Sequence, residues 1–200
     1  MIRQYRAADY DAVSRVCLLT AEGGGDATGR YSSDDLMPDI FARPYVSLVP
    51  ELAFVVEIDG AVVGYILGVA DTRAFVGRFR SEWMPRIEAA YHHAQPVLTK
   101  DDLIRHLGFW PERMLIAEVD DYPAHLHIDL LPEAQGLGLG RRLVDTLIAA
   151  LRERDVAGLH LTMDAANTGA RAFYDRLGFT ELPSSTPESP TLGMLLRHPS

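Results

Sequence analysis

Apolar and polar residues alternate over several short runs, and these runs predict the strands of the fold. The runs at 52–58 and 61–70 are joined by Asp59-Gly60, a dipeptide typical of a two-residue β-hairpin turn. A further alternating run occupies 159–163, and Thr191 to Arg197 has the pattern of a closing strand. The chain therefore contains a sheet with a strong antiparallel hairpin.

Helical spacing of apolar residues separates these strands. A first helix is expected to end before the glycine run at 23–25, because glycine is too flexible to continue it. A second helix is expected over 33–42 and should stop at Arg43-Pro44, since the residue before a proline is biased away from helical geometry. Strands and helices thus alternate from the N-terminus onward.

Two more helical patterns, at 75–92 and 100–107, lie between the hairpin and the next strand. We interpret the whole segment 72–121 as a helical insertion that packs on its own domain, and whether it also covers a pocket stays open. The 200 residues suit one domain with a sizeable core, so we predict a single domain over 1–200.

An apolar strand that runs into a glycine-rich turn and then into a helix is the strongest chemical signal. The glycines of the turn are Gly136, Gly138 and Gly140. The first amides of a helix lack intrahelical acceptors and carry partial positive charge, so a turn without side chains lets a pyrophosphate approach them closely. Arg141 and Arg142 add positive charge at the same place.

Two common phosphate-binding loops do not fit this turn. A Walker loop that starts at Gly136 requires a second glycine where Arg141 stands. The dinucleotide fingerprint, with glycines at the first, third and sixth positions, also meets Arg141 at its last glycine. What remains is Gln135-x-x-Gly138-x-Gly140.

This remaining pattern resembles the Gln/Arg-x-x-Gly-x-Gly/Ala signature with which the GNAT superfamily of N-acetyltransferases holds the pyrophosphate of acetyl-coenzyme A. A second segment, from Asn167 to Phe179, is similar to that family's Asn-x-x-Ala-x-x-Phe-Tyr-x-x-x-Gly-Phe pattern. Asn167 would cap the helix of this segment and Gly178 would end it. On these two segments, in the right order and one strand apart, the chain is identified as a member of the superfamily.

The resemblance implies an α/β fold with a mixed, mainly antiparallel twisted sheet flanked by helices, the helical insertion preceding the cofactor-binding strand. A narrower likeness covers most of the chain: it is similar to bacterial relatives of the acetyltransferase-like C-terminal domain of O-GlcNAcase. That likeness rests on the insertion and on short segments at 24–28, 31–32, 44–45 and 50–55. It implies no particular acceptor.

The resemblance also implies which residues bind acetyl-coenzyme A and which transfer protons. The backbone of the strand would pair with pantetheine, and Leu130 or its neighbour would polarise the acetyl carbonyl. Tyr174 occupies the position of the family's general acid, and its hydroxyl would protonate the departing thiolate. The implied cofactor-binding residues are Ile128, Leu130, Leu131, Gln135, Gly136, Leu137, Gly138, Leu139, Gly140, Arg141, Asn167, Arg171 and Tyr174.

The general base is left open among several residues. Asp121 falls closest to the family's usual carboxylate position when counted back from Pro132, and His127 is the alternative whose ordinary pKa suits the task. Asp120, His125 and Asp129 also compete, and ordered water is a further alternative. The acceptor is expected to be a primary amine on a small molecule or a peptide.

Net charge and composition limit the classes of binding partner. A formal net charge of -9 argues against nucleic acid and against an anionic membrane surface, and it leaves a cationic or neutral substrate open. No apolar run reaches the roughly 18 residues of a membrane span, and the N-terminus does not resemble a signal peptide. We therefore predict a cytoplasmic protein, and a homodimer stays open.

Two other functions were weighed. His125-x-His127-x-Asp129 is similar to part of the metal motif of metallo-β-lactamase-like hydrolases, but Leu130 replaces its last histidine, so no metal site is expected. A domain that binds acetyl-coenzyme A without catalysis is the stronger alternative, because the base is unassigned.

Overall fold

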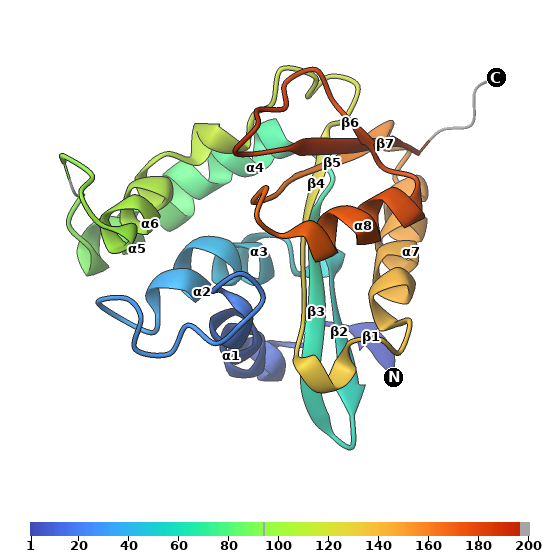
Figure 1. Cartoon of the computed structure of the whole chain (residues 1–200), viewed down its shortest axis with the longest axis horizontal. Coiled ribbons are helices and arrows are strands. Elements are labelled where there is room, and N and C mark those ends of the chain that lie inside the picture. The colour runs from blue at the N-terminus through green and yellow to red at the C-terminus, as the bar shows by residue number, and fades with distance from the viewer. Residues whose placement is uncertain (94, 197–200) are drawn as a thin grey trace.

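The computed structural model describes residues 1–93 and 95–196, in which a central sheet is covered by helices on both faces (Figure 1). The described strands are β1 Ile2–Gln4, β2 Ala53–Ile58, β3 Ala61–Val69, β4 Ala124–Leu130, β5 Gly158–Thr162, β6 Thr180–Glu181 and β7 Thr191–Leu195. The α-helices are α1 Tyr10–Thr20, α2 Leu36–Phe41, α3 Arg43–Leu48, α4 Thr72–Arg78, α5 Met84–Ala90, α6 Lys100–Phe109, α7 Leu139–Arg152 and α8 Thr168–Leu177. Arg197, the last residue of the predicted closing strand, lies outside the described residues.

The sheet is mixed and mainly antiparallel, as predicted, with strand order β1-β2-β3-β4-β5-β7-β6. The predicted hairpin is β2-β3, and its turn residues Asp59 and Gly60 have φ values of 50° and 79°. Strand β4 pairs with β3 from His125 to Leu130, whereas its parallel pairing with β5 is confined to Ala124 and His125. Beyond His125 the two strands diverge.

Helices α1 and α7 pack on opposite faces of β3 and β4 (Figure 1). Residues of β3 alternate between these faces, so Tyr65 points toward α1 and Gly68 toward α7. A Cβ atom at Gly68 would lie 2.5 Å from Leu147 of α7, which shows how closely that helix approaches the sheet. The site described below therefore has a rigid sheet behind it.

One helix of the structure was not predicted from the sequence. The predicted helix over 33–42 does end near Ala42, as α2, but a further helix, α3, begins directly at Arg43. Pro44 lies in the first turn of α3, where a missing N–H costs nothing because it would have no intrahelical acceptor. The predicted helix at 75–92 is likewise interrupted, by a π-helical turn at Phe79–Trp83 between α4 and α5.

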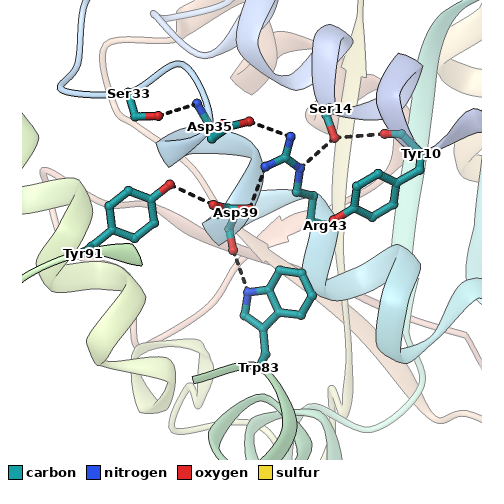
Figure 2. Close-up of polar contacts among 8 residues, drawn as sticks. All are labelled: Tyr10, Ser14, Ser33, Asp35, Asp39, Arg43, Trp83 and Tyr91. Atoms are coloured by element: carbon teal, nitrogen blue, oxygen red, sulfur yellow. Dashed lines mark hydrogen bonds and ion pairs between the residues drawn. The ribbon is translucent and has the colours of Figure 1, made fainter. Parts of the chain in front are cut away.

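Polar contacts around Asp39 attach the 72–121 segment to α2 and α3 (Figure 2). The Asp39 carboxylate accepts a hydrogen bond from Tyr91 at 2.7 Å and pairs with Arg43 at 2.8 Å. The Asp39 carbonyl accepts a hydrogen bond from the Trp83 indole at 2.8 Å. These contacts join the insertion to the helices that precede the hairpin. Among the described helices, none is both long and apolar enough to cross a lipid bilayer.

Gly158 marks the closed end of the gap between β4 and β5. A Cβ atom there would lie 2.4 Å from the backbone oxygen of Asp121, so the backbone must move to accept a side chain. We expect Gly158→Ala to lower the free energy of unfolding by about 1–3 kcal/mol in urea denaturation. Gly77→Ala is the control, because Gly77 lies in α4 with open space around it, and it should be neutral or stabilising by up to about 1 kcal/mol. Equal stabilities of the two variants would contradict this close approach.

Candidate functional site

The turn between β4 and α7 is built from backbone that side chains would strain. Gly136 and Gly138 both have φ of 73°, in the left-handed region that favours glycine, and Gly138 is the N-cap of α7. The turn has open space around both glycines, where a Cβ atom would meet nothing within 4 Å. The first-turn amides of α7 therefore face a cleft of about 640 Å³ without side chains in the way.

Side chains on both sides hold this turn in place. Gln135 donates from Nε2 to the carbonyl oxygen of Leu130 at 2.9 Å, which ties the turn back to the strand. Arg141 donates from Nη2 to the carbonyl oxygen of Arg176 at 2.9 Å. Both of these arginines line the cleft. A helix N-terminus with two arginines beside it is suited to an anion.

Most residues that the sequence proposed for cofactor binding line this one cleft. They are Ile128, Leu130, Gln135, Gly136, Gly138, Leu139, Gly140, Arg141, Asn167 and Tyr174. The cleft also has walls that sequence reasoning missed, because they come from α1, the loop after it and α8. Those residues are Thr20, Gly23, Gly24, Gly169, Ala170, Phe173 and Arg176.

Three proposed cofactor residues do not line the cleft. The side chain of Leu131 is buried in the core, and its amide donates to Val63 of β3. Leu137 is exposed on the outside of the turn. Arg171 pairs with Asp175 and Glu181 on the outer side of α8. The sequence could not show these competing partners.

The unpaired edge of β4 faces the same cleft. Because the Leu131 amide points to β3 and backbone direction alternates along a strand, the backbone groups of Ile128 and Leu130 point the other way. On that side β5 has already diverged, since its pairing stops at His125. A ligand in the cleft can therefore pair with the Ile128 backbone and the Leu130 amide as an added strand would, while the Leu130 carbonyl oxygen accepts from Gln135.

Helix α8 contributes Asn167 and Tyr174. Asn167 accepts a hydrogen bond from the Ala170 amide at 3.0 Å, so it is the predicted helix cap and a cleft residue at once. Tyr174 packs between Phe173 and Phe179, and its hydroxyl makes no hydrogen bond to another residue of the described chain. Burial, with the nearby charge of Asp129, raises the pKa of Tyr174, which keeps its proton available for donation.

Asp129 is the acidic group of the cleft. Its carboxylate accepts a hydrogen bond of 2.5 Å from Tyr65. Burial raises the pKa of Asp129 to about 7, although hydrogen bonds from Tyr65 and Thr20 act in the opposite direction. A carboxyl group that titrates near neutral pH inside a cleft has the property that a general base needs.

The two residues that the sequence ranked first as bases lie elsewhere. Asp121 is exposed in the turn before β4, at the end of that strand away from Gly136, and it does not line the cleft. His127 lines a second cavity, where burial and then the charge of Arg113 lower its pKa to about 3. An imidazole with that pKa is a weak base near neutral pH.

Comparison with known proteins adds the following. Residues 26–179 match the model of the acetyltransferase (GNAT) family. O-GlcNAcase of Rattus norvegicus is 22% identical over 90% of this chain, which spans only 20% of that protein. The 5-NmdU N-acetyltransferase of Pseudomonas phage PaMx11 is 36% identical over 58% of this chain and 78% of its own length. The crystal structure of SsHAT is 47% identical, with a TM-score of 0.93 over 99% of this chain and 98% of that one.

The raised pKa of Asp129 predicts a pH-dependent effect of Asp129→Asn on stability. An ordinary aspartate has a pKa near 3.8, so between about pH 4 and pH 7 the folded parent holds a proton on Asp129 that the unfolded chain has lost. The parent therefore loses stability as the pH rises through that range. The asparagine variant has no carboxyl group at position 129, so its stability lacks this dependence on pH.

Urea denaturation of both proteins at pH 4.5 and pH 8 measures this effect. We expect the stability of Asp129→Asn relative to the parent to rise by about 1–3 kcal/mol from the lower pH to the higher. The expected rise is smaller than the whole pKa shift of Asp129 would give, because the Asp129 side chain is only half-buried. A difference that stays constant with pH would show that Asp129 titrates normally.

Proposed function

The chain belongs to the acetyltransferase (GNAT) family, and from that premise we propose that it transfers an acetyl group from acetyl-coenzyme A to a primary amine. The amine attacks directly while donor and acceptor are both bound. One observation carries the proposal: the glycine turn, the unpaired edge of β4, Asp129 and Tyr174 all face one cleft. The alternative, acetyl-coenzyme A binding without transfer, provides no role for these two titratable groups. We propose a cytoplasmic location, as the sequence predicts.

The residues of the cleft fit the donor. Amides in the first turn of α7 and the guanidinium of Arg141 would hold the pyrophosphate, and the backbone of Ile128 and Leu130 would pair with pantetheine. Asn167 offers a further polar contact at the same wall. When bound, acetyl-coenzyme A supplies a thioester whose acetyl group is activated toward a neutral amine.

The protein's part in the reaction is proton transfer. A primary amine must shed a proton to attack, and Asp129 accepts it because its carboxylate titrates near neutrality. As the new C–N bond forms and the C–S bond breaks, Tyr174 donates its hydroxyl proton to the departing sulfur, and the proton that the acetylated nitrogen then loses restores the phenol. We therefore propose Asp129 as the base in place of Asp121 or His127, and we retain Tyr174 as the acid.

Gly138→Val tests the binding of the donor. Valine at φ of 73° strains the turn and places a branched side chain before the first amides of α7, so we expect affinity for acetyl-coenzyme A to fall at least about 100-fold in calorimetry. Gly29→Val is a matched control, because Gly29 has φ of 67° with open space and does not line the cleft. Similar affinity in Gly138→Val and Gly29→Val would contradict the assignment of the turn.

Asp129→Asn and Tyr174→Phe test the proton transfers. We expect Asp129→Asn to lower kcat/KM by about 10²–10⁴-fold and Tyr174→Phe to lower kcat, while both variants keep their affinity for acetyl-coenzyme A. In the parent, kcat/KM should rise with pH through about 7, and Asp129→Asn should lose that rise.

Release of coenzyme A over a panel of amines provides the rates for these variants. Asp121→Asn is the control for the base, since that carboxylate is exposed outside the cleft, and its rate should equal that of the parent. An unchanged rate in Asp129→Asn would remove Asp129 from the role of base.

A further inference from the structure

A second cavity, of about 550 Å³, opens where β4 and β5 diverge, and we name it the histidine pocket. It adjoins the cleft of about 640 Å³ at the glycine turn, which we name the donor cleft. The two meet along β4, since His127 lines the pocket and Asp129, two residues further on, lines the donor cleft. Side chains on one face of a strand repeat every second residue, so His127 and Asp129 project from the same face about 7 Å apart. Residues that define the pocket are His125, His127, His160, Thr162, Trp110 and Arg113.

Arg113 is a cation of this pocket that has no carboxylate partner among the described residues. Its Nε donates to the carbonyl oxygen of Leu107 at 3.1 Å, and its guanidinium carbon lies 5.2 Å from the centroid of the Phe41 ring. Within the described part of the chain, Arg113 forms no ion pair and its two terminal nitrogens make no hydrogen bond. Neighbouring arginines differ, because Arg80 pairs with Glu112 and Arg105 with Asp101.

The rest of the lining supplies no negative charge. No Asp or Glu of the described residues lines the pocket, and burial lowers the pKa of each of its three histidines, so that they are neutral near pH 7. Glu118 interacts with His160 from outside the lining and accepts a hydrogen bond from the Ser184 amide. On a chain with net charge -9, this pocket is a locally positive recess.

Buried hydrogen bonds also determine which ring nitrogen of His127 carries the proton and which has a free lone pair. Thr72 donates its only hydroxyl proton to Pro123 at 2.7 Å, so it must accept from Nδ1–H of His125 at 2.8 Å. His125 Nε2 then accepts from the Tyr45 hydroxyl at 2.9 Å, and the Tyr45 oxygen accepts from Nε2–H of His127 at 3.0 Å. Nδ1 of His127 is left with a lone pair and no partner among the described residues.

We propose that the histidine pocket binds an anionic group of the acceptor, a carboxylate or a phosphate, through the guanidinium of Arg113. The acceptor is then an amine that also carries a negative charge several bonds from its nitrogen. A desolvated arginine binds most strongly to an oxyanion with two acceptor atoms, because two N–H groups can donate to it at once. Nδ1 of His127 adds an acceptor for a hydroxyl or amide group on the same molecule. This inference rests on the proposed acetyl transfer and specifies its substrate class.

Matched amines test the proposal by equilibrium binding. The probes are 5-aminopentanoate, 4-aminobutyl phosphate, pentylamine and 1,5-diaminopentane, titrated by calorimetry into the full chain saturated with coenzyme A. We expect at least one anionic amine to bind about 10- to 100-fold tighter than the neutral and cationic ones, and the tighter of the two anions identifies the group. Equal or undetectable affinity for all four amines would overturn the proposal.

Variants then assign the preference to Arg113. Arg113→Gln should abolish the preference for the anionic amine, and Arg113→Lys should restore part of it because the charge remains. Arg80→Gln should bind like the parent, since Arg80 is exposed and outside the pocket. Unaltered preference in a folded Arg113→Gln, with a melting temperature near that of the parent, would overturn the proposal.

Loss of the anion preference and loss of acetyl transfer give different results. In the first case the protein binds acetyl-coenzyme A and acetylates pentylamine as fast as the anionic amines. That result would overturn the role of Arg113 and leave the proposed acetyl transfer intact. Absence of any affinity of the parent for acetyl-coenzyme A would overturn the proposed function itself.

Discussion

The divergence of β4 from β5 is the constraint on which the rest of the site depends. The two strands pair only at Ala124 and His125, while β4 continues along β3 to Leu130. Backbone groups that lose a strand partner need another, because buried or half-buried amides are costly to leave unpaired. The gap therefore creates both a binding edge on Ile128 and Leu130 and the space for a ligand to use it.

Two cavities with different chemistry meet along this one strand. Backbone amides, glycines and Arg141 dominate the donor cleft, whereas neutral histidines and Arg113 dominate the histidine pocket. Asp129 lies between them, with its titration shifted toward neutral pH by burial. An acceptor that enters from the pocket would thus meet a group able to take its proton where the donor cleft begins.

Local features of the sequence predicted the fold and the glycine turn well. The Asp59-Gly60 hairpin, the glycine turn and the Asn167 cap are each fixed by a few adjacent residues, and the structure has all three. Helix α3 was missed because proline, which disfavours the end of one helix, also suits the first turn of the next.

Features that depend on distant residues could not be predicted. Asp129 owes its raised pKa to burial, and the hydrogen bond from Tyr65 opposes that shift; its own neighbours in sequence reveal neither effect. Arg171 was among the implied cofactor-binding residues but pairs with Glu181. The overall net charge suggested a cationic or neutral acceptor, whereas the local surroundings of Arg113 favour an anionic one, because composition averages over the whole surface.

Hydrogen exchange of individual amides, followed with and without saturating acetyl-coenzyme A, tests the central claim most directly. The account predicts that the amides of Ile128 and Leu130 and those from Gly138 to Arg141 gain protection together, because they are the groups that receive the ligand. The amide of Leu159 in β5, already paired with Met194 of β7, should change little. Saturation by acetyl-coenzyme A without added protection at 128, 130 and 138–141 would contradict the account.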